Sequence, residues 1–491
     1  REYEDHIREH HCEAGICRSM FQSPCQNACP ADVDVAGFLT LIQNGRTMDA
    51  YNLIRHENPF PAVCGRVCTH PCEDKCARSQ RDVSVAICDL ERFVSDYALN
   101  HTGHFVDDIR YPRNNKKVAI IGAGPSGLTC AYYLARLGYS VDVYESKPQA
   151  GGTLAYGVPE FRLPEDILQH EIKLIQEEGV VIHLNTQIGK DTAFEQLKEN
   201  ADAIYVSTGA PLRNDLGLEG ENLKGVYYGL PLLQDLRAGR RVRVGKNVLV
   251  IGGGTTAMDA ARSALRLGAQ QVTVLYRREK EDMPASRLEV AEALEEGVRI
   301  LTLTGSVRIL GDDKGRVTGV LCQKMTPGKY DNEGRPTAEP VENSEFTIPA
   351  DMVIPAVSQH ADYPFAGGGE KQDAWEGVEV SRHSLMTNVD GIFAGGDLTR
   401  GSDTAIAAIA DGKRAAANID KYLGGEGILN KGRPIDVPSS SADEDSTEYG
   451  RFPLEKLSPS VRVQGFREVN KGYRKLYAVA EATRCLGCDR R

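Results

Sequence analysis

The stretch KKVAIIGAGPSGLTCAYYLARLGYSVDVYE, residues 116–145, decides the fold of this chain. It reads as an apolar strand, a glycine turn, an amphipathic helix and a second strand, the order of a nucleotide-binding βαβ unit. Gly122, Gly124 and Gly127 occupy GxGxxG positions, where glycines allow a tight turn and a close approach of backbone to a pyrophosphate. Glu145 ends the second strand and is placed to accept hydrogen bonds from ribose hydroxyls. A lone glycine motif would be a weak signal, but this complete context predicts a dinucleotide site.

A second unit of the same kind, KNVLVIGGGTTAMDAARSALRLGAQQVTVLYR, spans residues 246–277. Its three fingerprint positions hold small residues: Gly252, Gly254 and Ala257. The predicted nucleotide contacts extend to the first residues of the two helices: Pro125, Ser126, Thr255 and Thr256. The second strand ends in Arg277 and Arg278, and guanidinium groups bind a 2′-phosphate that a carboxylate would repel. The pair therefore predicts NADPH in preference to NADH, although two arginines on a solvated surface would look the same.

Length and composition limit the class of protein. The 491 residues suggest about three domains, and 41% hydrophobic with 26% charged residues is ordinary globular composition. The net charge of −11 gives no reason to expect nucleic acid or an acidic membrane surface as partner. No apolar run reaches the ~18 residues of a membrane helix, and no signal-peptide pattern is present. We expect a cytoplasmic protein, and the first residue, Arg1, leaves open whether the chain is a fragment or a processed form.

The thirteen cysteines are unevenly distributed, with nine in residues 12–88 and two near residue 490. The motifs PCQNACP (24–30) and CGRVCTHPCEDKC (64–76) space thiols as C-x3-C, interrupted by proline and glycine. Several sulfurs that converge in this way suit an iron–sulfur cluster. A secreted disulfide framework fits poorly, because nucleotide-binding units of this kind belong to reducing compartments.

A third motif, IFAGGDL, follows a strand and supplies Asp397. The helix that begins near Thr404 is predicted to direct its N-terminal amides at a developing negative charge. On a flavin, that charge develops at the pyrimidine end of the ring on reduction.

Together with GAGPSG and AGGDL, the motifs GGTLAYGVPEFRLP (151–164), YVSTGA (205–210) and YRREKEDMPA (276–285) resemble the family of the NADPH-dependent glutamate synthase small subunit. That family includes the flavin half of dihydropyrimidine dehydrogenase and the large subunit of the bifurcating NADH-dependent ferredoxin:NADP oxidoreductase. The resemblance runs from about residue 20 to 420. It implies an α/β fold in which a helical N-terminal iron–sulfur domain precedes two Rossmann-like dinucleotide-binding domains.

The domain limits expected from this resemblance fall where the composition and the hydrophobic pattern of the sequence change. They are a zinc-binding segment at 1–20, a helical domain with two [4Fe–4S] clusters at 21–112, an FAD domain at 113–245 and 355–423, an NADPH domain at 246–354, and a C-terminal arm at 424–491. The segment 301–349 is expected to form short strands with loops, as an elaboration of the second nucleotide unit.

The resemblance also implies the residues that contact FAD. They are Glu145, Gly152, Leu154, Arg162, Gly396, Asp397, Thr404 and Ala405. The chain departs from the family at AVSQHAD (356–362), where relatives usually read AIGQxPD. Ser358 thus replaces a glycine near the expected nicotinamide and flavin, and the geometry there is in question.

For the first cluster, the resemblance implies three thiolates and an oxygen ligand: Cys29, Cys68, Cys72 and Glu91. Cys88, one helical turn before Glu91, is the competing ligand. For the second cluster, relatives use a segment EAxRCLxC upstream of PCxxxCP, whereas here EATRCLGC lies at the other end of the chain. We therefore predict a displaced ligand pair that joins distant cysteines, in this chain or in a neighbouring one: Cys25, Cys76, Cys485 and Cys488.

The segment HIREHHCEAGIC is similar to one in the flavin subunits of NAD-linked hydrogenases and complex I-type dehydrogenases. Histidine and cysteine at this spacing suit tetrahedral zinc, so His6, Cys12 and Cys17 are predicted to hold zinc with a fourth ligand from elsewhere. The remaining cysteines are interpreted as structural: Cys64, Cys130 and Cys322.

The main functional prediction is an NAD(P)H-dependent FAD iron–sulfur oxidoreductase subunit. It exchanges hydride between NADP(H) and FAD, and passes single electrons through two [4Fe–4S] clusters to partner subunits of NADH dehydrogenase, ferredoxin or hydrogenase type. The zinc segment favours a bifurcating or NADH-linked assembly. The alternatives are the glutamate synthase small subunit itself, a thioredoxin-reductase-like dithiol flavoenzyme that uses the terminal CLGC, and an electron-conducting scaffold with a silent nucleotide site.

Overall fold

Short helices form the N-terminal part of the computed structural model, which describes residues 22–101, 111–331, 334–363, 369–373, 377–430, 435–439 and 450–489. They are α3 (Pro24–Ala28), α4 (Val35–Gln43), α5 (Thr47–Glu57), α6 (Pro61–Val67), α7 (Pro71–Asp74), the 3₁₀ helix η1 (Ala77–Gln80) and α8 (Ile87–Asn100). Three of them begin with proline, which is tolerated in the first helical turn and cannot extend a helix backwards. Three cysteines fall in the breaks between these helices: Cys29 follows α3, Cys68 follows α6 and Cys76 precedes η1.

A five-stranded parallel sheet has the strand order β14-β4-β1-β2-β3. Its strands are β1 (Lys117–Ile121), β2 (Ser140–Tyr144), β3 (Val181–His183), β4 (Ala203–Val206) and β14 (Ile392–Ala394). Helices α9 (Pro125–Arg136) and α17 (Ala405–Tyr422) pack against each other beside it, and α10 (Thr153–Tyr156), α11 (Glu165–Glu177), α12 (Phe194–Asn200) and α16 (Asp397–Arg400) complete this unit. Because β14 lies far along the chain from the other strands, the sheet is assembled from two separate segments.

A second parallel sheet, in the order β12-β6-β7-β8, is built from residues between those two segments. Its strands are β6 (Asn247–Ile251), β7 (Gln271–Leu275), β8 (Arg299–Leu301) and β12 (Met352–Pro355). The helices α13 (Gly229–Arg237), α14 (Thr255–Arg266), α15 (Arg287–Glu295) and η2 (Lys280–Asp282) belong to it. The small antiparallel pair β5 (Leu212–Arg213) and β13 (Gln359–His360) joins the two units. The predicted fold class, a helical domain with two Rossmann-like units, is confirmed.

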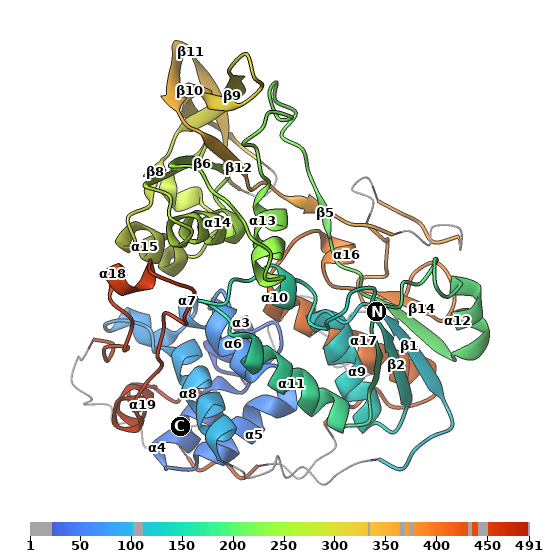
Figure 1. The fold of residues 1–491 in the computed structure, drawn as a ribbon. Helices are drawn as coiled ribbons and strands as arrows, with labels where there is room; N and C mark the ends of the chain where they lie inside the picture. Colours follow the sequence, from blue (N-terminus) through green and yellow to red (C-terminus); the bar gives the residue numbers. More distant parts are fainter. Residues whose placement is uncertain are drawn as a thin grey trace.

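Long antiparallel strands stand above the second sheet in Figure 1. They are β9 (Thr304–Gly311), β10 (Val317–Tyr330) and β11 (Pro336–Pro349). The expectation of short strands here was wrong, since β10 and β11 each have 14 residues. Register irregularities near Gln323 and Pro327 let the pairing continue through the proline and glycine that suggested loops.

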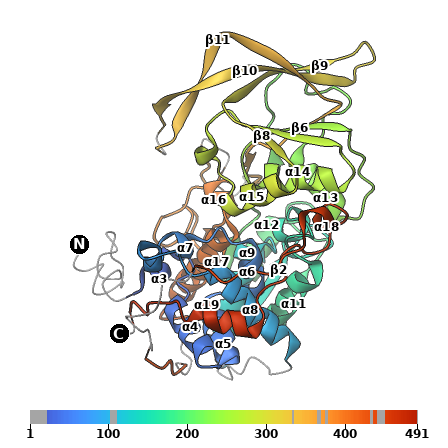
Figure 2. The ribbon, with the colours of Figure 1, turned by 90° about the vertical axis from the view of Figure 1, so that its left-hand side faces the viewer.

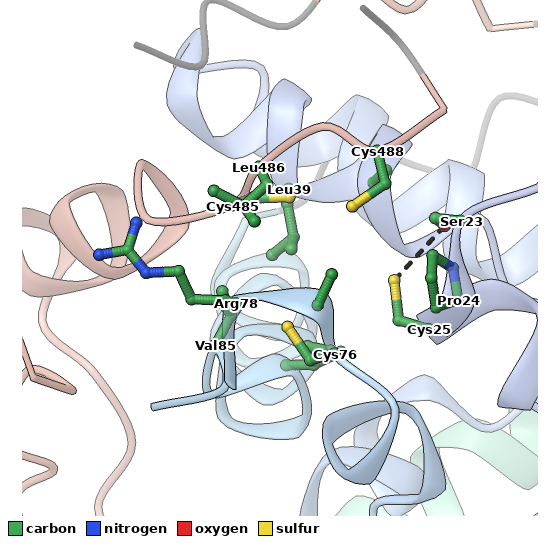
Figure 3. A pocket seen from close by; sticks show the side chains of 13 residues that line it. Ser23, Pro24, Cys25, Leu39, Cys76, Arg78, Val85, Cys485, Leu486 and Cys488 are labelled. Atoms are coloured by element: carbon green, nitrogen blue, oxygen red, sulfur yellow. Dashed lines mark hydrogen bonds between the residues drawn. The ribbon is translucent and has the colours of Figure 1, made fainter. Parts of the chain in front are cut away.

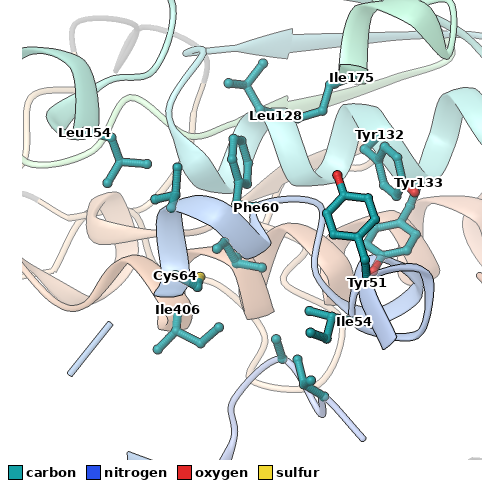
Figure 4. Packing of buried hydrophobic residues seen from close by; sticks show 14 of the residues in the cluster. Tyr51, Ile54, Phe60, Cys64, Leu128, Tyr132, Tyr133, Leu154, Ile175 and Ile406 are labelled. Atoms are coloured by element: carbon teal, nitrogen blue, oxygen red, sulfur yellow. The ribbon is translucent and has the colours of Figure 1, made fainter. Parts of the chain in front are cut away.

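One continuous hydrophobic core joins the helical part to the first sheet. Figure 4 shows Phe60 next to Leu128 and Tyr51 next to Tyr132, both of α9, while Cys64 lies near Ile406 of α17. The Glu171 carboxylate of α11 accepts hydrogen bonds from the amides of Ala62 (2.8 Å) and Val63 (3.0 Å), and so caps α6 from outside. The helical part is thus fixed against the first nucleotide unit.

The C-terminal arm returns to the N-terminal helices, as Figure 2 shows. It contains α18 (Pro459–Arg462) and α19 (Lys475–Ala482), and α19 packs on α4 and α8. The buried Glu481 carboxylate accepts from the amides of Ala86 and Phe452, both at 2.9 Å, and pairs with Arg484 at 2.6 Å. No helix within the described ranges combines the length and apolar character of a membrane span.

Candidate functional site

A cavity of about 380 Å³ lies at the carboxyl ends of the first sheet's strands and reaches the second unit. Most predicted nucleotide contacts line it: Gly122, Gly124, Pro125, Ser126, Glu145, Gly152, Leu154, Arg162, Thr255, Thr256, Gly396, Asp397, Thr404 and Ala405. The predicted contacts that do not line it are Gly127, Gly252, Gly254, Ala257, Arg277, Arg278 and Ser358. Both fingerprint helices therefore present their first turns to one space.

Glu145 lies buried at the end of β2 and holds the turn that follows β1. Its Oε2 accepts from the Ala123 amide at 3.0 Å, and its Oε1 accepts from the Lys147 amide at 2.9 Å. Oε1 also accepts from the Ser146 hydroxyl at 3.4 Å, whereas Oε2 has a further lone pair that can accept from a ribose hydroxyl at the cavity wall. This geometry fits the predicted role in binding the adenosine half of FAD.

The turn backbone leaves room for a pyrophosphate at Gly124. A Cβ atom placed on Gly124 would meet only the Cα of Gly152, at 4.0 Å, so the open side of this glycine faces the cavity. Gly122 differs, since it has φ +101° and its Cβ would lie 2.5 Å from the Ser207 carbonyl oxygen. The fold requires a glycine at position 122, whereas the open space beside Gly124 fits a ligand.

We expect Gly124→Val to fold normally and to lose FAD. Gly124 has φ −80°, which valine adopts, but a branched side chain there would occupy the pyrophosphate position. Flavin bound per chain after purification should fall about tenfold or more, the change that ~1.4 kcal/mol of binding energy represents. Gly465→Val, where no atom lies within 4 Å of a new Cβ, is the control that should retain FAD. Full flavin content in Gly124→Val would contradict this placement.

Helix α17 starts at the cavity, and Asp397 lies beside it. The Thr404 hydroxyl accepts from the Ala407 amide at 3.3 Å, which caps the helix and leaves its first turn directed toward the cavity. Burial raises the pKa of Asp397 to about 7, and its carboxylate accepts only weakly from the Asp403 amide at 3.3 Å. These groups can receive the polar edge of a flavin ring.

Arg162 contacts the second nucleotide unit as well as the cavity. Its Nη1 lies 2.7 Å from Asp259 Oδ2 and its Nη2 lies 2.7 Å from Glu289 Oε1, on α14 and α15. Asp259 also lines the cavity, and its Oδ1 is a buried acceptor without a hydrogen-bond partner. The predicted FAD contact thus also joins the two nucleotide units.

The arginine pair after β7 has unequal surroundings. Arg277 is exposed and makes no ion pair or side-chain hydrogen bond in the part of the chain that the structure describes. Arg278 donates from Nε to the Pro336 carbonyl oxygen at 2.8 Å, and its Nη2 lies 3.1 Å from Asp331 Oδ2. These partners were not predicted: Pro336 begins β11, and Asp331 lies in the turn between β10 and β11.

Ser358 is exposed, and its hydroxyl accepts from the Asn214 amide group at 3.0 Å. The next residue, Gln359, lines the cavity in its place. The substitution of the family's glycine is therefore accommodated at the surface, in the link between the two units.

A first cysteine pocket adjoins the cavity described above, which we call the flavin cavity after its predicted ligand. The four predicted ligands line it: Cys29, Cys68, Cys72 and Glu91. Val67 and Thr69, on either side of Cys68, line the flavin cavity. Ile406 of α17 lines the cysteine pocket, and the preceding Ala405 lines the flavin cavity. The two sites therefore share a wall.

Cys64 and Cys88 also line the first cysteine pocket. The interpretation of Cys64 as purely structural overlooked this position, although Cys64 and Cys68 have the same C-x3-C spacing as the predicted ligands. The Cys88 thiol lies within hydrogen-bonding reach of both Cys68 and Cys72. Cys88 and Glu91 both remain suitable as the fourth ligand.

Glu91 has the surroundings of a group that needs a cation. Its carboxyl is buried, it accepts one hydrogen bond, from Asn58 at 3.3 Å, and burial raises its pKa well above the usual range. A positively charged iron–sulfur core beside it would offset that desolvation cost. The donor set of this pocket therefore fits an iron–sulfur cluster.

A second cysteine pocket brings together the two ends of the chain (Figure 3). All four predicted ligands line it: Cys25, Cys76, Cys485 and Cys488. The described cysteines are free thiols, and the Cys25 thiol donates a hydrogen bond to the Ser23 hydroxyl at 3.4 Å. Four converging thiols without disulfides fit a cluster held within one chain. The predicted zinc ligands, His6, Cys12 and Cys17, lie outside the described residues, and that site stays a prediction.

Comparison with known proteins identifies the family. Residues 116–412 match the family described as pyridine nucleotide-disulphide oxidoreductase. The chain belongs to this family. Residues 2–103 of this oxidoreductase also match the family described as dihydropyrimidine dehydrogenase domain II, 4Fe-4S cluster.

The sequence similarity to several curated proteins covers most of this oxidoreductase. It is 39% identical to NADP(+)-dependent formate dehydrogenase subunit beta of Moorella thermoacetica, over 97% of this chain and 72% of that protein. It is 38% identical to NADPH-Fe(3+) oxidoreductase subunit beta of Geobacter sulfurreducens, over 96% of this chain and 75% of that protein. It is 36% identical to the glutamate synthase [NADPH] small chain of Escherichia coli, over 84% of this chain and 91% of that protein. The predicted resemblance is confirmed, and the chain is an NAD(P)H-dependent FAD oxidoreductase with a 4Fe–4S domain.

Among solved structures, FprA of Mycobacterium tuberculosis in complex with NADPH aligns with a TM-score of 0.56 at 19% identity. The alignment covers 63% of this oxidoreductase and 85% of FprA. At this identity the likeness shows the fold of the two nucleotide units alone.

Proposed function

We propose that the chain is an electron-transfer subunit that links NADP(H) and FAD to partner subunits through two [4Fe–4S] clusters. The observation that supports this most is the order of three adjoining sites. The flavin cavity shares a wall with the first cysteine pocket at Cys68, and Ile87 lines both cysteine pockets. Beyond them, Cys488 is exposed at the surface. This order leads from the nucleotide to a place where a partner can bind.

FAD would exchange a hydride with the nicotinamide and single electrons with iron–sulfur clusters. The residues of the chain bind and orient these groups. Glu145 and the first turn of α9 hold the adenosine and pyrophosphate, and the first turn of α17 faces the flavin edge. Thr255 and Thr256 bring the second nucleotide into the same cavity. No side-chain acid, base or nucleophile is required for this exchange.

The partner complex is inferred from the extent of similarity. The relatives are named as subunits or chains of larger enzymes, which supports a multi-subunit assembly. The two beta subunits match 97% and 96% of this chain, against 84% for the glutamate synthase small chain. The longer match supports an assembly of the beta-subunit kind over glutamate synthase itself, and we retain the proposal of a bifurcating or NADH-linked complex.

The dithiol alternative has less support. A terminal disulfide-exchanging pair must reach its substrate, whereas Cys485 is buried beside Cys25 and Cys76. A dithiol enzyme would also leave the first cysteine pocket without a role.

The proposal is tested by adding NADPH anaerobically to the isolated chain and measuring its flavin absorbance and iron content. We expect the flavin to bleach and roughly eight irons per chain, as two [4Fe–4S] clusters require. Flavin that does not bleach would indicate a silent nucleotide site and an electron-conducting scaffold. A chain without iron would favour the dithiol enzyme.

A further inference from the structure

Two turns of the long hairpins have the same sequence pattern, DDKGR at 312–316 and DNEGR at 331–335. Their described backbone bonds match as well. The aspartate amide donates to the arginine carbonyl oxygen at 2.8 Å in both turns, and the glycine amide donates to the aspartate carbonyl oxygen at 2.9 and 3.0 Å. In both, the aspartate Oδ1 accepts from the arginine amide at 2.9 Å. Among the described bonds, the aspartate side chain therefore accepts from the turn backbone through Oδ1 in both turns.

The second carboxylate oxygen has a different partner in each turn. Asp312 Oδ2 pairs with the arginine of its own turn, at 2.9 Å to Arg316 Nε and 2.8 Å to Nη2. Asp331 Oδ2 lies 3.6 Å from Arg335 Nε but 3.1 Å from Arg278 Nη2. The negative charge of Asp331 is thus directed at the arginine pair that follows β7.

We infer that Asp331 is an internal competitor for the 2′-phosphate of NADP(H), which rests on the proposed role of Arg277 and Arg278. The Arg278 guanidinium is held by Asp331 and by the Pro336 carbonyl oxygen. A phosphate that binds Arg278 must displace the Asp331 carboxylate or lie close to a like charge. Arg277 is exposed, and its guanidinium contacts the 2′-phosphate first, without having to displace a carboxylate.

This competition sets the specificity and the release of the nucleotide. The Arg278 side chain is 11% exposed and Asp331 25% exposed, so the pair lies near solvent, where such ion pairs are exchanged readily. The competitor lowers affinity for NADP(H) without changing affinity for NAD(H), which lacks the 2′-phosphate. It thereby favours departure of the oxidised or reduced nucleotide after hydride exchange.

The matched variants are Asp331→Asn and Asp312→Asn. An asparagine keeps the Oδ1 acceptor that each turn uses, removes the negative charge and replaces the Oδ2 acceptor with an NH2 donor. We expect Asp331→Asn to bind adenosine 2′,5′-bisphosphate about fivefold more tightly by titration calorimetry at low salt, the size expected of a near-surface ion pair. Binding of 5′-AMP should not change, and Asp312→Asn should match the wild type with both ligands.

The outcomes separate this inference from the proposed function. If the wild type prefers the 2′,5′-bisphosphate but Asp331→Asn binds it equally or more weakly, Asp331 is only a structural anchor and the inference is overturned. If the wild type shows no preference for the 2′-phosphate, the role of the arginine pair fails together with the inference. Asp331→Ser, which also keeps a turn-capping oxygen, should give the same gain if Asn disturbs folding.

Discussion

Cys485→Ala is expected to remove one cluster and to stop electron delivery beyond it, while NADPH still bleaches the flavin. The Cys485 thiol lies in the second cysteine pocket with Cys25 and Cys76, and alanine has no ligand atom. Iron should fall from roughly eight to roughly four per chain. NADPH-driven reduction of cytochrome c should fall about 100-fold or more, since loss of the terminal carrier leaves only slow direct transfer from the inner carriers, equivalent to a barrier increase of ~2.7 kcal/mol.

Two further variants make the result specific. Glu91→Ala should also block acceptor reduction, because its carboxylate lies in the first cysteine pocket next to the flavin cavity. Cys322→Ala is the control, since Cys322 is buried in the separate core beneath the hairpins and should keep its iron and activity. Full iron and full acceptor activity in Cys485→Ala would show that the terminal pair does not hold a cluster within its own chain.

The second large effect is expected for Arg277→Ala. Its exposed guanidinium is the uncontested donor for a 2′-phosphate, and a charge-assisted hydrogen bond contributes ~1.5–3 kcal/mol. The KM for NADPH in flavin reduction should therefore rise about 10- to 100-fold, whereas the KM for NADH should change less than about twofold. Stopped-flow bleaching of the flavin with each nucleotide measures both values.

Arg299→Ala is the matched control, because Arg299 is an exposed arginine at the start of β8 in the same sheet. It should leave both KM values unchanged. An equal loss of NADPH and NADH affinity in Arg277→Ala would assign Arg277 to the nucleotide's shared parts. Unchanged kinetics would place the 2′-phosphate elsewhere.

Local pattern predicted much of the site, because the relevant contacts follow from position within one βαβ unit. Gly124 and Glu145 lie where the fingerprint places them, at a helix start and a strand end. Cys485 was predicted from a motif found at the wrong end of the chain, and the structure brings it to Cys25. For Gly124 and Glu145 a short sequence pattern carries its own geometry, whereas Cys485 was predicted from the resemblance to the family.

The features of the site that were not predicted depend on contacts between elements far apart in sequence. The partner of Arg278 is Asp331, which reaches it only because β10 and β11 extend further than their proline and glycine content indicates. Cys64 was separated from the ligands because spacing alone cannot show that α6 directs it into the same pocket as Cys68. Side-chain direction at such positions is fixed by tertiary packing, which periodicity does not encode.

The meeting of the two chain ends also sets an order of biosynthesis. The proposed ligands of the inner pocket all precede the nucleotide units in the chain, although Ile406 of α17 completes its wall. The outer pocket needs Cys485 and Cys488, which are translated hundreds of residues after Cys76. The proposed outer cluster would therefore be completed only after both nucleotide units have been synthesised.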